Sequence, residues 1–362
     1  MSSSPQALRV LIVRLGAMGD ILHALPAVTA LRTSLRSSNT PAFLGWAIEP
    51  QWQPLLCAAS SVEPVRGPQM PVIDTLHRVP AKDWARRPLS SATLHEVQAV
   101  RSGLRARRYD VCVDLQGALR SAWIGRMAAA PRLIGEANPR EPLARWVFKE
   151  RIETRGVHVI EQAREVVAAV LGKSLPGCAA ELPIDSQAEQ WCQDWLAERS
   201  ITRYILMNPG AGWGAKRWPA ARYAAVAAEL ARMGYATIVN VGPGEEQMVN
   251  AMSSAAPVST FAMKGSIGQL IACTRRAQLF IGGDTGPLHL ASALQVPVVG
   301  IYGPTDPARN GPFETRALVL RHPASKRDHS RKSEPEAGLL TITVADVLQA
   351  AQELLAEAEN AE

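Results

Sequence analysis

The chain has 362 residues and a formal net charge of +6; 47% of its residues are hydrophobic and 20% are charged. These values exclude a disordered or fibrous chain and predict two soluble domains of ordinary size. The apolar runs are shorter than the ~20 residues of a membrane span, the start lacks a signal-peptide pattern, and five scattered cysteines form no C-x-x-C pair. We therefore expect a cytoplasmic protein without a disulfide framework or zinc site. Its positive charge favours an anionic partner: nucleic acid, an acidic membrane surface or a phosphorylated substrate.

The first half of the chain alternates predicted strands with predicted helices. Residues 8–13 form an apolar, β-branched run typical of a buried parallel strand, and residues 20–35 repeat their apolar positions at helical spacing. The same patterns predict strands at 41–48 and 109–115, and helices at 94–108, 118–128 and 157–172. Such alternation indicates a parallel sheet covered by helices.

The second half repeats this organisation after the segment 173–185, which has two prolines, a glycine and no clear period. Strands are predicted at 203–210, 235–242, 278–284 and 296–304, and helices at 219–234, 245–255, 266–277 and 287–294. Residues 322–338 predict an exposed polar loop, and an amphipathic helix covers 344–359. We expect an α/β chain with two doubly wound domains, 1–175 and 176–340, and a C-terminal helix within 341–362.

Ligands of doubly wound sheets bind outside the carboxyl ends of the strands, so the loops that follow the strands are the candidate sites. In the second half, the turn Asp284-Thr285-Gly286 leads from a strand into a helix with Pro287 in its first turn. The N–H groups and the dipole of this helix start predict a phosphate site. A helix cap formed by Asp284 is the alternative, and His289 is expected to pack within the helix layer.

A second strand-to-helix loop holds Gly210 and Gly212 and presents Lys216 just before its helix. A lysine over a glycine-rich loop can neutralise a diphosphate, although no Walker A pattern is present; a solvated surface lysine is the alternative. A third loop places Glu245 and Glu246 at a helix start, where they either bind a ribose or cap the helix. Two phosphate-competent loops in one half predict a nucleotide diphosphate as ligand.

The loop after the first strand, residues 14–19, reads R-L-G-A-M-G where a dinucleotide-binding fold needs G-x-G-x-x-G, so the first glycine is missing. Asp20 follows at the helix start and would repel a pyrophosphate. Both features disfavour a nicotinamide oxidoreductase. Asp20 could take a proton from a hydroxyl group or cap the helix, and the residues alone leave both roles open.

In combination, these segments resemble the ADP-heptose:lipopolysaccharide heptosyltransferases of glycosyltransferase family nine, most closely the heptosyltransferase I branch. The resemblance rests on an ordered set of motifs: RVLIVRLGAMGDILHALPAV, VDLQGALRSAWIGRMAAAPRLIGEANPREPLAR, AKRWP and GGDTGPLHLASALQVPVVGIYGPTDPARNGP. It implies a GT-B architecture, in which two Rossmann-like domains face a cleft, the first binding the acceptor and the second the sugar nucleotide. It also implies transfer of a heptose from ADP-heptose to the lipopolysaccharide inner core, with inversion at the anomeric carbon and without a cofactor or metal.

The motifs also imply roles for individual residues. Asp20 matches the family's general base, Lys216 its diphosphate-binding lysine, and Glu246 or, less securely, Glu245 its ribose-binding acid. The predicted donor-binding residues are Lys216, Glu246, Asp284, Thr285, Gly286, Gly210 and Gly212. The predicted acceptor-binding residues are Gly19, Arg120, Arg140 and Arg145. Guanidinium groups suit the carboxylates of Kdo sugars or the phosphates of lipid A, and solvated arginines are the alternative.

The expected partners follow from the same resemblance. They are an ADP-sugar donor, a Kdo-lipid A acceptor and the anionic inner leaflet of the inner membrane, with no nucleic acid; the surplus positive charge and the tryptophans fit such a surface. Two alternatives stay open: a related family member with another sugar nucleotide or acceptor, and a nucleotide-diphosphate-binding protein without catalysis. The presence of both Asp20 and Lys216 argues against the second.

Overall fold

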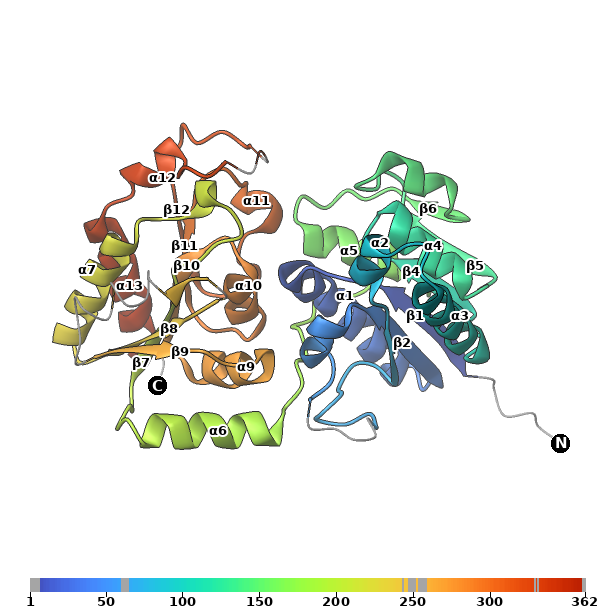
Figure 1. The fold of residues 1–362 in the computed structure, drawn as a ribbon, viewed down its shortest axis with the longest axis horizontal. Helices are drawn as coiled ribbons and strands as arrows, with labels where there is room; N and C mark the ends of the chain where they lie inside the picture. The colour runs from blue at the N-terminus through green and yellow to red at the C-terminus, as the bar shows by residue number, and fades with distance from the viewer. Residues whose placement is uncertain are drawn as a thin grey trace. The chain divides into compact units, whose positions relative to one another are not determined.

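A computed structural model describes residues 7–59, 65–242, 244–246, 252, 259–328, 330 and 332–359. The chain divides into two compact units, residues 1–184 and 185–362 (Figure 1). This division falls later than the boundary at residue 175 that the sequence predicted, because the segment leading to it is bound to the first unit. The backbone N–H of Ile184 donates to the carbonyl of Pro68 (2.9 Å), and that of Glu181 donates to the Thr29 hydroxyl (3.4 Å).

Unit 1 is built on a six-stranded parallel sheet with the order β3-β2-β1-β4-β5-β6. The strands are β1 (Leu8–Val13), β2 (Ala42–Ile48), β3 (Thr75–Arg78), β4 (Val111–Asp114), β5 (Arg132–Glu136) and β6 (Glu150–Ile152). The helices are α1 (Met18–Ser37), α2 (Ala81–Arg86), α3 (Ser91–Ala106), α4 (Leu119–Met127) and α5 (Val159–Ala168), with 3-10 turns η1 (Pro50–Leu55) and η2 (Pro142–Trp146). Helices α1 and α5 cover one face of the sheet, and α3 and α4 cover the other (Figure 1).

Unit 2 repeats this topology with the order β12-β11-β10-β7-β8-β9. Its strands are β7 (Tyr204–Asn208), β8 (Ala236–Asn240), β9 (Thr260–Met263), β10 (Leu279–Gly283), β11 (Val298–Tyr302) and β12 (Ala317–Arg321). Its helices are α6 (Ser186–Ala197), α7 (Ala220–Arg232), α9 (Ile267–Arg276), α10 (Gly286–Ala293), α11 (Pro307–Asn310), α12 (Ala337–Thr341) and α13 (Val344–Glu359), with the turn η3 (Gly214–Lys216). The prediction of two doubly wound α/β domains is confirmed.

The apolar strand runs are explained by burial on both faces of each sheet. Val10, Leu11 and Ile12 have no exposed surface, as expected for a central parallel strand between two helix layers. Five strands, β3, β5, β6, β9 and β12, were not predicted. They are three to five residues long; four of them are edge strands and β5 lies next to an edge strand, where the apolar pattern is weaker.

Helix α13 belongs to unit 2 and is not a separate C-terminal part. Its residues Val347, Ala351 and Leu354 are buried in the core of that unit, together with side chains of α7 and the central strands. The predicted helix 245–255 lies largely outside the described residues.

The segment that follows β12 is irregular and mostly exposed in its described residues, as predicted, but it is anchored to the η3 loop. The N–H of Ala215 donates to the carbonyl of Lys332 (3.1 Å), and the N–H of Glu336 donates to the carbonyl of Ala215 (3.2 Å). A Cβ added to Gly214 would lie 1.5 Å from the carbonyl oxygen of Ser333, so this close approach needs a glycine. The segment therefore fixes the backbone immediately before Lys216.

Candidate active site

Each sheet has one point where the strand order reverses, and this is where ligands of doubly wound folds bind. In unit 1 the reversal lies between β1 and β4, and in unit 2 it lies between β7 and β10. The loops at the carboxyl ends of these four strands carry most of the predicted site residues.

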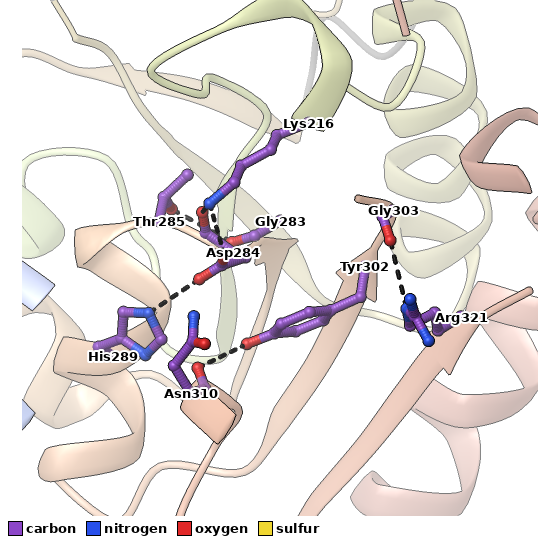
Figure 2. A network of polar contacts seen from close by, with 9 residues as sticks. All are labelled: Lys216, Gly283, Asp284, Thr285, His289, Tyr302, Gly303, Asn310 and Arg321. Carbon is purple, nitrogen blue, oxygen red and sulfur yellow. Dashed lines mark hydrogen bonds and ion pairs between the residues drawn. The ribbon is translucent and has the colours of Figure 1, made fainter. Parts of the chain in front are cut away.

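In unit 2, a buried ion pair stands at the end of β10. The Asp284 carboxylate accepts from Lys216 Nζ through Oδ2 (2.5 Å) and contacts His289 Nε2 through Oδ1 (3.0 Å). Figure 2 shows these three side chains converging from the β10 turn, the η3 loop and α10. His289 is buried in the helix layer, as predicted, but it also holds one oxygen of Asp284.

The surroundings of Asp284 keep its carboxyl group ionised. Burial alone would raise its pKa, but the hydrogen bond and charge of His289 and the charge of Lys216 outweigh burial and hold the pKa of Asp284 well below its usual range. Lys216 is itself only 13% exposed, and its Nζ lies 4.5 Å from the ring centroid of Trp213. The ammonium group is therefore fixed between a carboxylate and an aromatic face, and Lys216 is not a solvated surface lysine.

The start of α10 lies directly beside this ion pair. Thr285 is the N-cap residue, and Gly286 and Pro287 form the first turn, so the helix begins with N–H groups that have no partner within the helix. The Thr285 hydroxyl donates to the carbonyl of Gly283 (3.2 Å) and accepts from Asn208 (3.4 Å). Positive charge from Lys216 and from the helix dipole thus meets at one place.

A second set of contacts brings the predicted Gly210 to the same edge. Asn208 Nδ2 also donates to the carbonyl of Gly210 (2.9 Å), and the Asn208 amide oxygen accepts from Asn240 (2.7 Å). A Cβ added to Gly210 would lie 1.7 Å from Glu245 Oε1, so the Glu245 side chain occupies the space that this glycine leaves. The N–H of Gly242 donates to the other Glu245 oxygen (2.8 Å).

The two neighbouring acids are therefore in different surroundings. Glu245 faces the Gly210 loop, whereas Glu246 is half-exposed and paired with Lys264 (3.1 Å). A Cβ added to Gly212 would meet nothing within 4 Å, so packing does not require a glycine there. The structure brings Lys216, Asp284, Thr285, Gly286, Gly210 and Glu245 together and leaves Glu246 turned toward Lys264.

In unit 1, Asp20 lies in the first turn of α1. Its Oδ2 accepts from the Ala17 N–H (3.1 Å), so the capping role is present, and its Oδ1 pairs with Arg14 Nη2 (2.9 Å). The side chain is 38% exposed and accessible to a second molecule. Arg14 also donates to the carbonyl of Leu115, and its own carbonyl accepts from Trp46 Nε1 (3.0 Å). Arg14 therefore ties Asp20 to the ends of β1 and β4.

Asp114, at the end of β4, is a buried acid beside this group that sequence reasoning missed. Its Oδ1 accepts the N–H groups of Gln116 and Gly117 (both 2.8 Å), and within the described structure its Oδ2 has no hydrogen-bond partner. Burial raises the pKa of the Asp114 carboxyl to about 6, against the lowering effect of those N–H groups and of Arg14. Asp114 is the aspartate of the VDLQG segment, but no residue spacing in the sequence assigned it a role.

The predicted acceptor-binding residues occupy the neighbouring loops of unit 1. Gly19 is partly buried in the first turn of α1, and Arg120 is exposed in the first turn of α4. The turn before α4 packs on the loop of Arg140, because a Cβ added to Gly117 would lie 3.0 Å from the Arg140 nitrogen. Arg145 lies farther along, on η2, with its guanidinium carbon 4.8 Å from the Trp146 ring centroid.

Comparison with known proteins decides the family. The model of "Glycosyltransferase family 9 (heptosyltransferase)" matches residues 97–339. The chain belongs to glycosyltransferase family 9. It is 25% identical to lipopolysaccharide heptosyltransferase 1 of Pseudomonas aeruginosa over 321 residues, which is 84% of this chain and 81% of the relative.

Solved structures of the same family support the GT-B fold. The Escherichia coli heptosyltransferase WaaC with ADP matches with a TM-score of 0.76 and 25% identity, over 96% of this chain and 100% of that one. The same enzyme with ADP-2-deoxy-2-fluoro heptose matches with a TM-score of 0.74 and 25% identity, over 96% and 99%. The predicted family and fold class are confirmed.

The described residues contain no group of three or more His, Cys, Asp and Glu side chains placed to hold a metal ion. No helix among them is both long and apolar enough to cross a membrane. Independence from metals stays a prediction.

The buried Asp114 generates a pH prediction. Its folded-state pKa of about 6 is above the ~3.9 of an unfolded aspartate, so ionisation opposes folding, and this group's contribution to stability falls as pH rises from about 4 to about 6. We expect Asp114→Asn to gain stability relative to the wild type over this range. Urea unfolding at about pH 4 and about pH 7 measures the difference. The exposed Asp83→Asn serves as control, and a parallel pH dependence in Asp114→Asn and the wild type would contradict the assignment.

Proposed function

We propose that the protein is an inverting heptosyltransferase, which moves a heptose from ADP-heptose to the Kdo-containing inner core of lipopolysaccharide. Unit 2 binds the donor, and unit 1 binds the acceptor. The observation that carries the proposal is the Lys216–Asp284 ion pair beside the start of α10, in a chain of glycosyltransferase family 9. The similar Escherichia coli enzyme, solved with ADP and with ADP-2-deoxy-2-fluoro heptose, supports the choice of donor.

The donor half of the reaction needs positive charge where the leaving group forms. As the bond from the sugar to the diphosphate breaks, negative charge collects on ADP, and Lys216 with the α10 N-terminus stabilises it. Asp284 holds the ammonium group in place before the donor arrives. An acid of the third loop binds the ribose, and the contact of Glu245 with Gly210 supports Glu245 over Glu246 for this role.

The acceptor half needs a base on the opposite face of the sugar. Asp20 takes the proton from the acceptor hydroxyl as its oxygen attacks the anomeric carbon, which inverts the configuration there. Each Asp20 oxygen already accepts one hydrogen bond, from Arg14 or Ala17, and these fix the direction of the carboxylate. Arg120, Arg140 and Arg145 supply guanidinium groups for the carboxylates and phosphates of the acceptor.

Turnover in a chelator tests the function as a whole. The purified protein is incubated with ADP-heptose and Kdo-lipid A, with and without a chelator, and both ADP release and product mass are followed. We expect an equal rate in both conditions, because Lys216 and the helix start provide the charge that a metal would otherwise supply. Transfer from a different sugar nucleotide only would favour the related family member, and ADP-heptose binding without transfer would favour the inactive binding protein. Loss of rate in the chelator would contradict independence from metals.

The role of Asp20 is separated from helix capping by a matched pair of variants. Asp20→Ala should lower kcat by about a hundredfold to ten-thousandfold, the usual contribution of a general base, and leave the dissociation constant for ADP-heptose unchanged. Glu161 holds the equivalent position on α5, where its carboxylate accepts the N–H of the N-cap residue His158 (3.0 Å). Glu161→Ala, which removes the same kind of cap, should therefore keep its rate. Similar kcat values in both variants would show that Asp20 only caps α1.

The role of Lys216 is measured on donor binding. Removal of a charged hydrogen-bond donor to the diphosphate should weaken ADP-heptose binding about tenfold to hundredfold in Lys216→Ala, as determined by calorimetry. Because the variant leaves Asp284 without its lysine partner, a thermal melt must confirm that unit 2 is folded. The exposed Lys173→Ala, in unit 1, is the control. Unchanged affinity in folded Lys216→Ala would remove this residue from the donor site.

A further inference from the structure

Three large apolar side chains of unit 1 are exposed on two elements that pack against each other. Trp123 lies on α4, and Leu143 and Trp146 lie on η2; they are 59%, 62% and 65% exposed. Helix α4 and η2 are in contact. Exposed apolar groups of this size are unfavourable in water, which favours a binding surface at this place.

Arginines surround these side chains. Arg120, Trp123 and Arg126 follow each other at three-residue spacing on α4, so they share one side of the helix, and all three are exposed. The guanidinium carbon of Arg151 lies 5.2 Å from the centroid of the Trp146 ring. The nearby acid Glu141 is engaged, because its carboxylate accepts the N–H of Leu119 (2.8 Å). We call the side chains of Trp123, Arg126, Leu143, Trp146 and Arg151 the Trp123 surface.

We propose that the Trp123 surface docks unit 1 on an anionic lipid bilayer. Tryptophan is the side chain that best suits the boundary between headgroups and acyl chains, and leucine adds apolar area below it. Arginines beside the indole rings meet the negative headgroups, and each basic residue near an anionic membrane strengthens binding. A protein partner would have to neutralise these arginines with acids of its own, whereas an anionic bilayer offers negative charge in every orientation. The charge of the surface therefore favours lipid.

The position of the Trp123 surface on α4 relates membrane docking to acceptor binding. Arg120 stands in the first turn of this helix, directly after the β4 loop, whereas Trp123 and Arg126 continue along the same side away from it. An acceptor anchored in the bilayer by acyl chains would thus present its polar part at the carboxyl edge of the sheet, where Asp20 and Arg120 lie. This use rests on the proposed function, but the docking itself does not.

Vesicle binding tests the proposal. The whole chain is sedimented with vesicles of phosphatidylglycerol and with vesicles of phosphatidylcholine. We expect binding to the anionic vesicles and a loss of about tenfold or more in affinity for both Trp123→Ser/Trp146→Ser and Arg151→Glu. Leu89→Ser, at a 91% exposed residue of the same unit, and Arg199→Glu, whose guanidinium lies 4.4 Å from the Trp195 ring centroid in unit 2, are matched controls that should bind like the wild type.

Three results would overturn the proposal. The first is wild-type binding by both surface variants, and the second is an equal loss of binding in the controls. The third is self-association of the wild type that disappears in Trp123→Ser/Trp146→Ser, because it would assign the surface to a second copy of the chain. Thermal melts establish that the variants are folded, and Arg151→Glu gives an independent result should the double variant unfold.

Two acceptors separate this proposal from the proposed function. At a saturating concentration of a soluble Kdo acceptor without acyl chains, the kcat of the surface variants should stay within about twofold of the wild type, since none of these side chains touches the reacting groups. A change in the acceptor KM does not count against the proposal, because Trp146 and Arg151 both contact the proposed acceptor-binding residue Arg145. On an acceptor embedded in anionic vesicles, their rate should fall with their affinity for the vesicles. Failure of the wild type on both acceptors would overturn the heptosyl transfer, while vesicle sedimentation would still decide the docking surface.

Discussion

The buried charge of Asp284 is the constraint on which the proposed donor site depends. A carboxylate removed from water is costly unless charged partners and hydrogen bonds compensate it, and here Lys216 and His289 do so. These partners come from the η3 loop and from α10, so movement of either element would remove one of the two partners of a buried charge. The segment after β12 adds a second restraint through Ala215. The ammonium group therefore stands beside the helix start before any ligand binds, which is the preorganisation that electrostatic stabilisation requires.

An ion pair lies at the strand-order reversal of each unit, and the more exposed members of the two pairs have opposite charges. At the β7–β10 reversal of unit 2, both members of the ion pair are largely buried, and the more exposed one is the Lys216 cation. At the β1–β4 reversal of unit 1, the more exposed group is the Asp20 carboxylate, and Arg14 is the more buried partner. A departing diphosphate needs positive charge, and a hydroxyl that loses its proton needs a base. The two switch points thus have the polarity that each half of a glycosyl transfer demands.

The sequence predicted the fold where burial leaves a clear pattern. Residues 8–13 and 344–359 were predicted with the bounds observed, because a central strand is continuously apolar and α13 repeats its apolar residues at helical spacing. The short strand β6 was not predicted, because three residues at a sheet edge show no such pattern. In the site, motifs marked Asp20, Lys216 and Asp284, whereas Asn208 and Asn240 were missed. Asn208 contacts Asn240 at the end of β8 and Thr285 after β10, and no local spacing encodes these contacts.

The first loop has an arginine in place of the first glycine of the dinucleotide-binding pattern, and this arginine has a structural role. In the pattern G-x-G-x-x-G, the position of the first glycine is taken by Arg14, and its side chain pairs with Asp20 immediately after the last glycine. The middle glycine is kept for another reason, because a Cβ added to Gly16 would lie 2.8 Å from Trp52 Nε1. The turn therefore retains the close approach of a Rossmann fold, but an arginine–aspartate pair stands at the helix start that would otherwise receive a pyrophosphate. The turn that binds phosphate in a Rossmann fold here holds the Asp20 carboxylate in place.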